Sequence, residues 1–250
     1  MAVSIKSARE IELMREAGKR LAHVHQELEA MIAPGISTWE IDAKGEKLIR
    51  DCGCIPNFLH YNGYPASICV SVNDEVVHGI PRKDRYLKEG DIVSLDAGLI
   101  YKGYHSDAAR THAVGKVSTE AQKLMDVTKQ SFFEGIKMAK EEQHLHDISR
   151  AIEEYVTPYG YGIVRDLVGH GIGTALHEDP QIPNYAQKRR GVRLQAGMTL
   201  AIEPMINAGT WQVRFLRDGW TVVTKDGSLS AHYENTILVT DGEPEILTLY

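Results

Sequence analysis

The sequence predicts one α+β domain that is built from two similar halves, and three observations lead to this prediction. Residues 87–96 and 194–203 are versions of each other, with a leucine, a glycine and an acid at matching places 107 residues apart. Each half begins with two helical patterns and continues with strand patterns. No linker rich in Pro, Gly or Ser separates the halves, so we expect a single domain whose halves span about 5–115 and 116–245.

Two helices are expected at the start of each half. In the first half, apolar Ile11, Met14 and Leu21 recur on or near one face after Ser7, a residue type that caps helix starts. Ser118 opens the same pattern in the second half, although only the first copy carries a well-placed partner acid for its cap. A further helix runs in each half, from Ser37 or Thr38 to before Gly53, and from near His146 to around Pro158.

Alternating apolar and polar residues predict the strands. The expected ranges are 67–72, 91–101 and 104–114 in the first half, and 163–168, 198–206, 213–217, 220–224 and 230–239 in the second. The turn-forming residues at 224–228 predict a hairpin between the last two. Because side chains alternate along a strand, Ser94 shares a face with Asp96, and Ala201 shares a face with Glu203. The apolar faces should therefore pack under the helices and leave both acids in an open concavity.

Composition excludes several classes of protein. The 250 residues carry a net charge of −6, so no broad surface for nucleic acid is expected, and the basic segment 188–193 is more often a solvated loop. No segment resembles a signal peptide or is apolar enough to cross a membrane. The three cysteines are an odd number without a zinc-binding spacing. Reduced thiols and a cytoplasmic location are the simplest interpretation.

Four acids recur in matched pairs on the expected strands. Asp96 matches Glu203, and Asp107 in His105-Ser-Asp107 matches Glu234 in His232-Tyr-Glu234. Carboxylates gathered in one place repel one another and resist desolvation unless cations neutralise them. Two divalent metal ions would balance four negative ligands.

One histidine strengthens this metal hypothesis. His170 lies in Gly169-His-Gly-Ile-Gly173, where glycines let the backbone approach closely. A phosphate-binding turn is not favoured there, since no helix-forming stretch follows. One imidazole with four carboxylates suits Mn, Fe(II), Co or Zn, and a pair of such ions activates water for hydrolysis.

Two more histidines are candidates for catalysis. His78 and His177 follow strand-like segments and precede loops with Gly or Pro, where catalytic residues gather. A histidine between apolar residues is often only structural. As imidazoles that bind no metal, they could instead donate a hydrogen bond to a scissile amide or to a developing oxyanion.

Over essentially its whole length, the chain resembles the type 1 methionine aminopeptidases of the short bacterial kind, which have the pita-bread fold. The motifs that carry the resemblance are Asn73-Asp-Glu-Val-Val-His-Gly-Ile-Pro81, Ser94-Leu-Asp96, Gly103-Tyr-His-Ser-Asp107, Gly169-His-Gly-Ile-Gly173, Leu176-His177, Ile202-Glu-Pro204 and His232-Tyr-Glu234. The resemblance implies a dinuclear metalloexopeptidase that removes the initiator methionine when the second residue is small. A water or hydroxide that bridges the metals would attack the scissile amide.

The resemblance also implies roles for single residues. Metal ligands would be Asp96, Asp107, His170, Glu203 and Glu234, with Asp107 and Glu234 bridging. Glu203 would also carry the proton of the attacking water, His78 would touch the amide or the leaving residue, and His177 would stabilise the tetrahedral intermediate. The methionine pocket maps onto Phe58, Tyr61, Tyr64, Cys69, Leu176 and Trp220. An apolar pocket with aromatic walls and a sulfur suits a thioether.

Two alternative functions stay open. A proline-specific peptidase of the same fold would share the metal ligands, although such relatives usually carry an extra N-terminal domain. A catalytically inactive pita-bread module that binds other molecules would typically lack some of the five ligands, all of which are present here. The expected partners are the N-termini of nascent polypeptides, with a possible ribosome contact, no membrane and no specific nucleic acid, and we expect a monomer.

Overall fold

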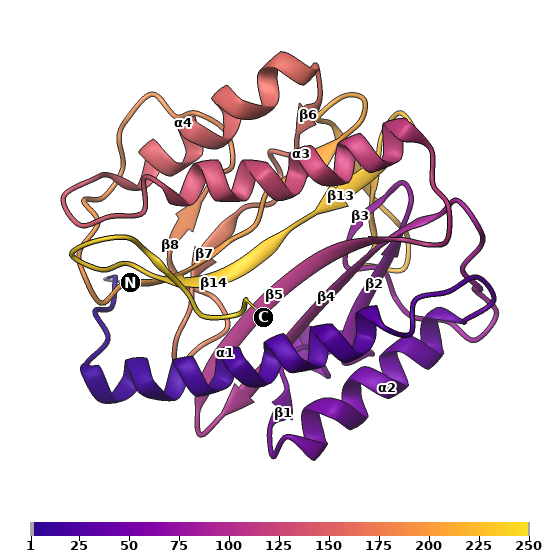
Figure 1. Ribbon diagram of the computed structural model, residues 1–250, viewed down its shortest axis with the longest axis horizontal. Coiled ribbons are helices and arrows are strands. Elements are labelled where there is room, and N and C mark those ends of the chain that lie inside the picture. The colour runs from indigo at the N-terminus through magenta and orange to yellow at the C-terminus, as the bar shows by residue number, and fades with distance from the viewer. Residues whose placement is uncertain (1–2, 250) are drawn as a thin grey trace.

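The computed structural model describes residues 3–249 and shows two similar halves that share one large sheet (Figure 1). Each half contributes two helices to the same side of that sheet. The helices are α1 (Ala8–Glu29), α2 (Thr38–Asp51), α3 (Thr119–Ile136) and α4 (Leu145–Val156), with short 3-10 turns at Tyr61–Gly63 and Thr157–Tyr159. In the described part of the chain, no helix combines the length and the apolarity that crossing a membrane requires.

The helix starts follow the predicted caps. Ser7 accepts a hydrogen bond from the backbone N–H of Glu10, whose carboxylate accepts one from the backbone of Ser7 in return. Ser37 forms the same reciprocal cap. Ser118 caps α3 with its hydroxyl alone, which confirms that only the first copy has a well-placed partner acid. These caps satisfy backbone donors that would otherwise lack partners in the first helical turn.

The large sheet has nine strands and joins the two halves. Its main path is β1-β4-β5-β14-β9-β7-β8, with β2 paired to β4 and β15 paired to β14, and every pairing is antiparallel. The strands are β1 (Ile55–Pro56), β2 (Ile68–Val72), β4 (Ile92–Tyr101), β5 (Tyr104–Ala113), β7 (Gly169–Gly171), β8 (Glu178–Ile182), β9 (Thr199–Ile202), β14 (Glu234–Leu238) and β15 (Glu245–Ile246). The halves meet where β5 pairs with β14, with Glu234 opposite Ala109.

Two small sheets complete the fold. One has the order β13-β10-β6 and the other β11-β12-β3. Their strands are β3 (Glu75–Val77), β6 (Gly162–Ile163), β10 (Met205–Asn207), β11 (Val213–Phe215), β12 (Val222–Thr224) and β13 (Ser230–His232).

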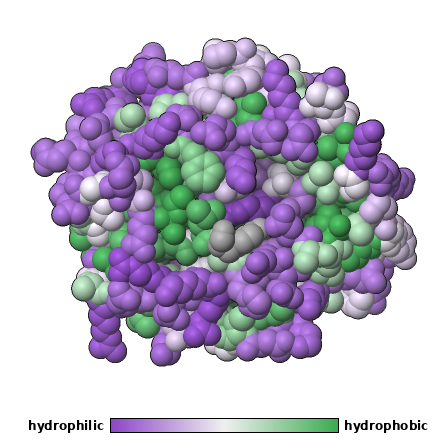
Figure 2. Space-filling model, in the orientation of Figure 1, coloured by the Kyte–Doolittle hydropathy of each residue, from purple (hydrophilic) through white to green (hydrophobic). Residues whose placement is uncertain are grey.

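The two largest hydrophobic clusters lie between the large sheet and the helices, one under each pair of helices. Val93 and Leu95 of β4 are buried in the cluster that contains residues of α1 and α2. Leu200 and Ile202 of β9 are buried in the cluster that contains residues of α3 and α4. The predicted strand faces are thus confirmed. On the side seen in Figure 2, hydrophilic side chains cover most of the surface and hydrophobic ones gather in separate patches.

Two predicted strands are each broken in two. The expected strand 198–206 is interrupted at Glu203 and Pro204. Pro204 has no N–H to donate, and its carbonyl accepts a hydrogen bond from the backbone N–H of Tyr233. The expected strand 230–239 is interrupted at Tyr233. The first segment leaves the large sheet there and enters the small sheet as β10, whereas the second leaves the small sheet after β13 and enters the large sheet as β14. The breaks therefore lie beside the two acids of the second half.

Other strand predictions were wrong. Residues 163–168 form a strand only at Ile163, because Arg165 and Asp166 turn outward into solvent. The turn at 224–228 exists, but β12 and β13 do not pair with each other: β12 pairs with β11 and β3. The strands β1, β3, β7, β8 and β15 were not predicted, because they are short or contain proline.

Close packing of α1 against the C-terminal segment yields a stability prediction. A Cβ added to Gly18 would lie 2.1 Å from the carbonyl oxygen of Leu247, a backbone atom that cannot turn aside. Gly18→Ala should therefore lower the free energy of unfolding by about 1–3 kcal/mol, despite the better helix propensity of alanine. Thermal denaturation measures the change, with Lys19→Ala on the exposed neighbour as control. A Gly18→Ala protein that is more stable than the wild type would contradict this packing.

Candidate metal centre

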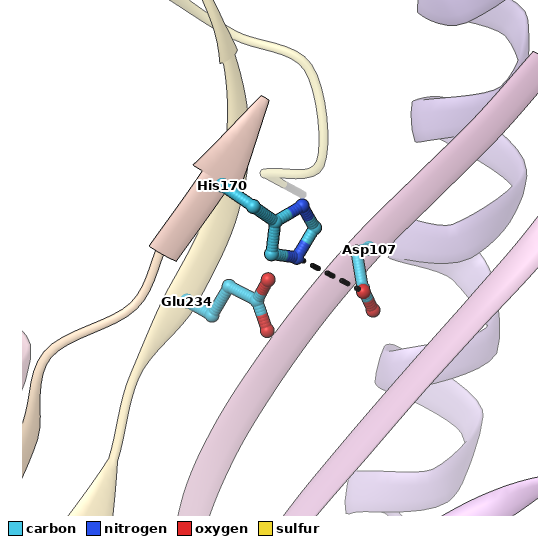
Figure 3. Close-up of side chains that lie close together, drawn as sticks. All are labelled: Asp107, His170 and Glu234. Atoms are coloured by element: carbon cyan, nitrogen blue, oxygen red, sulfur yellow. Dashed lines mark ion pairs between the residues drawn. The ribbon is translucent and has the colours of Figure 1, made fainter. Parts of the chain in front are cut away.

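The five predicted metal ligands come together on the side of the large sheet away from the helices. Asp96 lies on β4, Asp107 on β5, His170 on β7 and Glu234 on β14, while Glu203 follows the last residue of β9. Side chains of Asp107, His170 and Glu234 point toward one another in Figure 3, and each offers a ligand atom within 4.8 Å of the others. Both halves of the chain thus contribute to one cluster.

The orientation of His170 favours a cation in this cluster. Its Nδ1 lies 2.9 Å from the carbonyl oxygen of Gly171, which can only accept, so Nδ1 carries the proton. Nε2 then presents a lone pair, 3.6 Å from Glu203 Oε1 and 3.9 Å from Asp107 Oδ2. Burial lowers the pKa of His170 to about 4, which keeps the ring neutral. A lone pair that faces carboxylate oxygens is repelled unless a metal ion lies between them.

The carboxylates are crowded as well. Burial raises the pKa of Asp96 to about 7, and burial together with neighbouring carboxylates raises the pKa of Asp107, Glu203 and Glu234 well above the usual range. Asp96 Oδ1 and Glu234 Oε1 are buried, and neither has a hydrogen-bond partner among the described residues. Two like unit charges 4 Å apart repel by about 4 kcal/mol at an effective dielectric constant of 20. The cluster is therefore short of positive charge.

This donor set fits divalent metal ions. It offers oxygen ligands and one neutral imidazole nitrogen whose second nitrogen is fixed by a backbone carbonyl, the arrangement that orients metal-binding histidines. Four carboxylates can balance two divalent charges, and first-row ions accept such mixed oxygen and nitrogen ligands. The identity of the ion is not fixed by these ligands.

Hydrogen bonds between β5 and β14 hold the two halves in register. Arg110 donates hydrogen bonds to the backbone carbonyls of Ala109 and Glu234, and to Asn235 Oδ1 at 2.6 Å. The hydroxyl of Thr236 bridges the backbone N–H and carbonyl of Asp107 at 3.0 and 2.9 Å. These bonds fix β5 and β14 relative to each other, so the two acids on them cannot drift apart.

A cavity of about 270 Å³ joins the cluster to the predicted methionine pocket. Every residue predicted for the site lines it: the five metal ligands, His78, His177, Phe58, Tyr61, Tyr64, Cys69, Leu176 and Trp220. The rings of Tyr64 and Trp220 meet edge to face at 5.1 Å, and Tyr64 donates a hydrogen bond to the carbonyl of Gly79. The walls of the pocket are thus apolar and fixed.

The two remaining histidines flank the cavity differently. His78 has a φ of 58° at the end of β3, a strained conformation for a residue with a Cβ, and its ring lies 6.3 Å from that of Trp220. Burial lowers the pKa of His78 to about 4, and burial also lowers the pKa of His177. His177 is exposed at the rim, where its Nδ1 lies 2.8 Å from the hydroxyl of Tyr61. Both imidazoles are neutral at neutral pH.

Two residues of the site were not assigned from the sequence. Asn62 lines the cavity beside Tyr61. His232 is buried with its Nε2 3.9 Å from both Glu203 Oε2 and Glu234 Oε2. His232 lies two residues before Glu234, in the same motif, and this spacing was the only signal that could have identified it.

Metal addition should stabilise the fold. A divalent ion at 100 times its dissociation constant should raise the free energy of unfolding by about 2.7 kcal/mol, because it binds only the folded protein. The test compares melting temperatures of chelator-treated protein with and without Mn²⁺. Asp107→Asn should abolish the increase without destabilising the metal-free protein, since it removes one of several like charges. An equal increase in Asp107→Asn would contradict the assignment.

Comparison with known proteins agrees with this geometry. The model of metallopeptidase family M24 matches residues 12–241. The chain is 53% identical over 247 residues to a methionine aminopeptidase of Clostridium acetobutylicum, covering 99% of each chain, and 51% identical to methionine aminopeptidase 1 of Bacillus subtilis, covering 97% of this chain and 98% of that one. A crystal structure of methionine aminopeptidase from Thermotoga maritima superposes with a TM-score of 0.97 at 46% identity and full coverage of both chains. With its pita-bread fold, the chain belongs to metallopeptidase family M24.

Proposed function

We propose that this hydrolase is a methionine aminopeptidase, which removes the N-terminal methionine of nascent proteins and peptides when the second residue is small. The observation that carries the proposal is the single cavity that joins the carboxylate cluster to the apolar pocket. The relatives with more than half of their residues identical bear the same name. We assign cleavage of the peptide bond to the carboxylate cluster at one end of the cavity, and recognition of the methionine side chain to the apolar pocket at the other end.

Two divalent ions held by Asp96, Asp107, His170, Glu203 and Glu234 would supply a Lewis acid and a hydroxide nucleophile at neutral pH. We assign proton transfer to Glu203, because its carboxylate is partly accessible from the cavity while Asp107 and Glu234 are buried.

His177 is proposed to stabilise the developing oxyanion. Burial raises the pKa of Tyr61, so its hydroxyl stays protonated and can donate to His177 Nδ1. The proton of the neutral ring then resides on Nε2, which is free to donate toward the cavity. We assign to His78 a contact with the scissile amide or the leaving residue, because its neutral ring lines the same cavity.

The apolar end of the cavity is proposed to bind the methionine side chain. Phe58, Cys69 and Leu176 are nearly inaccessible and offer only apolar or weakly polar atoms to a ligand. Burial and the nearby Asp96 raise the pKa of the Cys69 thiol well above its usual value, so it presents neutral sulfur rather than a thiolate. A flexible thioether matches such a surface.

The wider properties of the protein also remain proposals. We propose that residues 1–250 act as one domain and as a monomer, in the cytoplasm, where the three free cysteines would stay reduced. Contact with the ribosome could use the exposed basic segment 188–193, in which Arg190 and Arg193 also pair with acids of the protein.

The substrate assignment predicts a clear preference between peptides. With Mn²⁺ or Co²⁺ added, the protein should hydrolyse Met-Ala-Ser and leave an Ala-Pro peptide intact, and chelator should abolish the activity. Release of free amino acid measures the rate. Glu203→Gln is the inactive control, since it removes the proposed proton carrier. Preferential cleavage of Ala-Pro would support a proline-specific peptidase, and no cleavage with any metal would support an inactive binding module.

Loss of the oxyanion donor should act on catalysis rather than on binding. His177→Ala is expected to lower kcat for Met-Ala-Ser by about 10²–10³, the usual cost of removing such a donor. Steady-state kinetics separate kcat from KM. A change confined to KM would show that His177 binds substrate without stabilising the transition state.

A further inference from the structure

The loop between β7 and β8 carries two residues of the site. Its first residue, Ile172, is buried in the core and is hydrogen-bonded to Thr199, and Gly173 accepts a hydrogen bond from the backbone of His105. Residues 172–177 include Leu176, which lines the pocket, and His177, whose ring lies 4.3 Å from that of His170. Thr174 and Ala175, in the middle of the loop, are exposed. The exposed middle of the loop therefore needs a further contact if His177 is to act at a defined position.

Glu178 supports the loop from its C-terminal end. One carboxylate oxygen, Oε1, accepts hydrogen bonds from the backbone N–H groups of Thr174 at 2.8 Å and Ala175 at 3.3 Å. The hydroxyl of Thr174 also lies 3.4 Å from this oxygen. The carboxylate closes the loop on itself, directly beside His177.

Lys6 in turn fixes Glu178. Its Nζ lies 2.6 Å from Glu178 Oε2, and the lysine side chain is only 5% exposed. Ser4 donates a further hydrogen bond to the same oxygen at 2.7 Å. A Cβ added to Gly173 would lie 2.5 Å from Lys6 Cε, so the loop packs directly on the lysine stem. Burial raises the pKa of Glu178, but the bonds from Lys6 and Ser4 outweigh it and keep that pKa below its usual value.

Lys6 itself is tied to rigid parts of the fold. Its backbone N–H donates to the carbonyl of Gly197 at 2.8 Å, in the turn that leads into β9. The next residue, Ser7, caps α1. The lysine therefore connects the start of α1 and the strand that leads to Glu203 with the loop that carries His177.

We propose that Lys6 is a positioning residue for catalysis, which acts through Glu178 to hold residues 172–177 so that His177 meets the reacting amide. This inference rests on the proposed function of His177. The partly buried ion pair suits this task, because further hydrogen bonds from Ser4 and from the loop backbone fix the same Glu178 carboxylate. Lys6 does not line the cavity, and its ammonium group bonds to Ser4 and Glu178, neither of which is a predicted metal ligand.

The kinetic test compares Lys6→Met with Lys19→Met. Methionine keeps most of the lysine stem and removes its charge, whereas Lys19 forms only an exposed pair with Glu16 on α1. Lys6→Met should lower kcat for Met-Ala-Ser about tenfold, since misplacement of a catalytic group by 1 Å costs up to about 10²-fold. Lys19→Met should match the wild type. A kcat of Lys6→Met within about twofold of the wild type overturns the proposal.

A double-mutant cycle separates positioning from general stability. In a His177→Ala background, Lys6→Met should change kcat by less than about twofold, because there is no imidazole left to position. An equal tenfold loss in both backgrounds would show that Lys6 acts elsewhere. Lys6→Arg should restore most of the rate by preserving the ion pair. If Lys6→Met does not fold, Glu178→Gln takes its place, because its amide oxygen can still accept from Thr174 and Ala175.

Hydrogen exchange of the metal-free protein tests the same contact without relying on activity. The peptide that covers residues 172–178 should exchange faster in Lys6→Met than in the wild type, while α2 exchanges at the same rate. Unchanged exchange in this peptide overturns the proposal. If the wild type failed to hydrolyse Met-Ala-Ser, the proposed function would fall, and the exchange comparison would still decide whether Lys6 holds the loop.

Discussion

The pairing of β5 with β14 is the constraint on which the site depends. It places Asp107 from one half of the chain and Glu234 from the other close together, although their charges repel. Neither half could form the cluster alone, because each supplies only part of the donor set. The hydrogen bonds of Arg110 and Thr236 and the packing of the two hydrophobic clusters under the helices hold this seam together.

The two faces of the large sheet have different roles: one packs against the helices, and the other carries the candidate site. Apolar residues on one face pack against four helices, so that face is closed to solvent. The other face carries the acids, and loops wall its cavity, among them the segment with His78 after β3 and the segment with Trp220 before β12. In the second half, the chain leaves the large sheet at Glu203 and Pro204 and returns to it after Tyr233, where β14 begins. Glu203 thus lies just past the end of β9, where its carboxylate is more accessible than those of Asp107 and Glu234.

The sequence was sufficient to predict the structural features that repeat in both halves or that depend on neighbouring residues. The matched acids, the face of Asp96 and the serine caps of α1 and α3 depend on alternation and on local hydrogen bonds, and the structure has them as predicted. The pocket residues came from the family resemblance, and all of them line the same cavity. This agreement concerns their location, whereas their roles remain proposals.

Features that depend on distant partners could not be predicted. The turn at 224–228 has the local signature of a hairpin, yet β12 finds its partners in β11 and β3. The role of His232 could not be predicted from a periodic pattern, because only the folded sheet brings its ring close to Glu203. Likewise, Lys6 and Glu178 lie 172 residues apart, and nothing in the sequence around either residue indicates that they meet.

Anomalous X-ray scattering from crystals grown with Mn²⁺ tests the central claim most directly. Convergence of acids from both halves predicts two manganese peaks, each within bonding distance of carboxylates from both halves, with His170 as the nitrogen ligand of one of them. Manganese bound elsewhere on the protein, with Asp96, Asp107, Glu203 and Glu234 left unligated, would contradict the account.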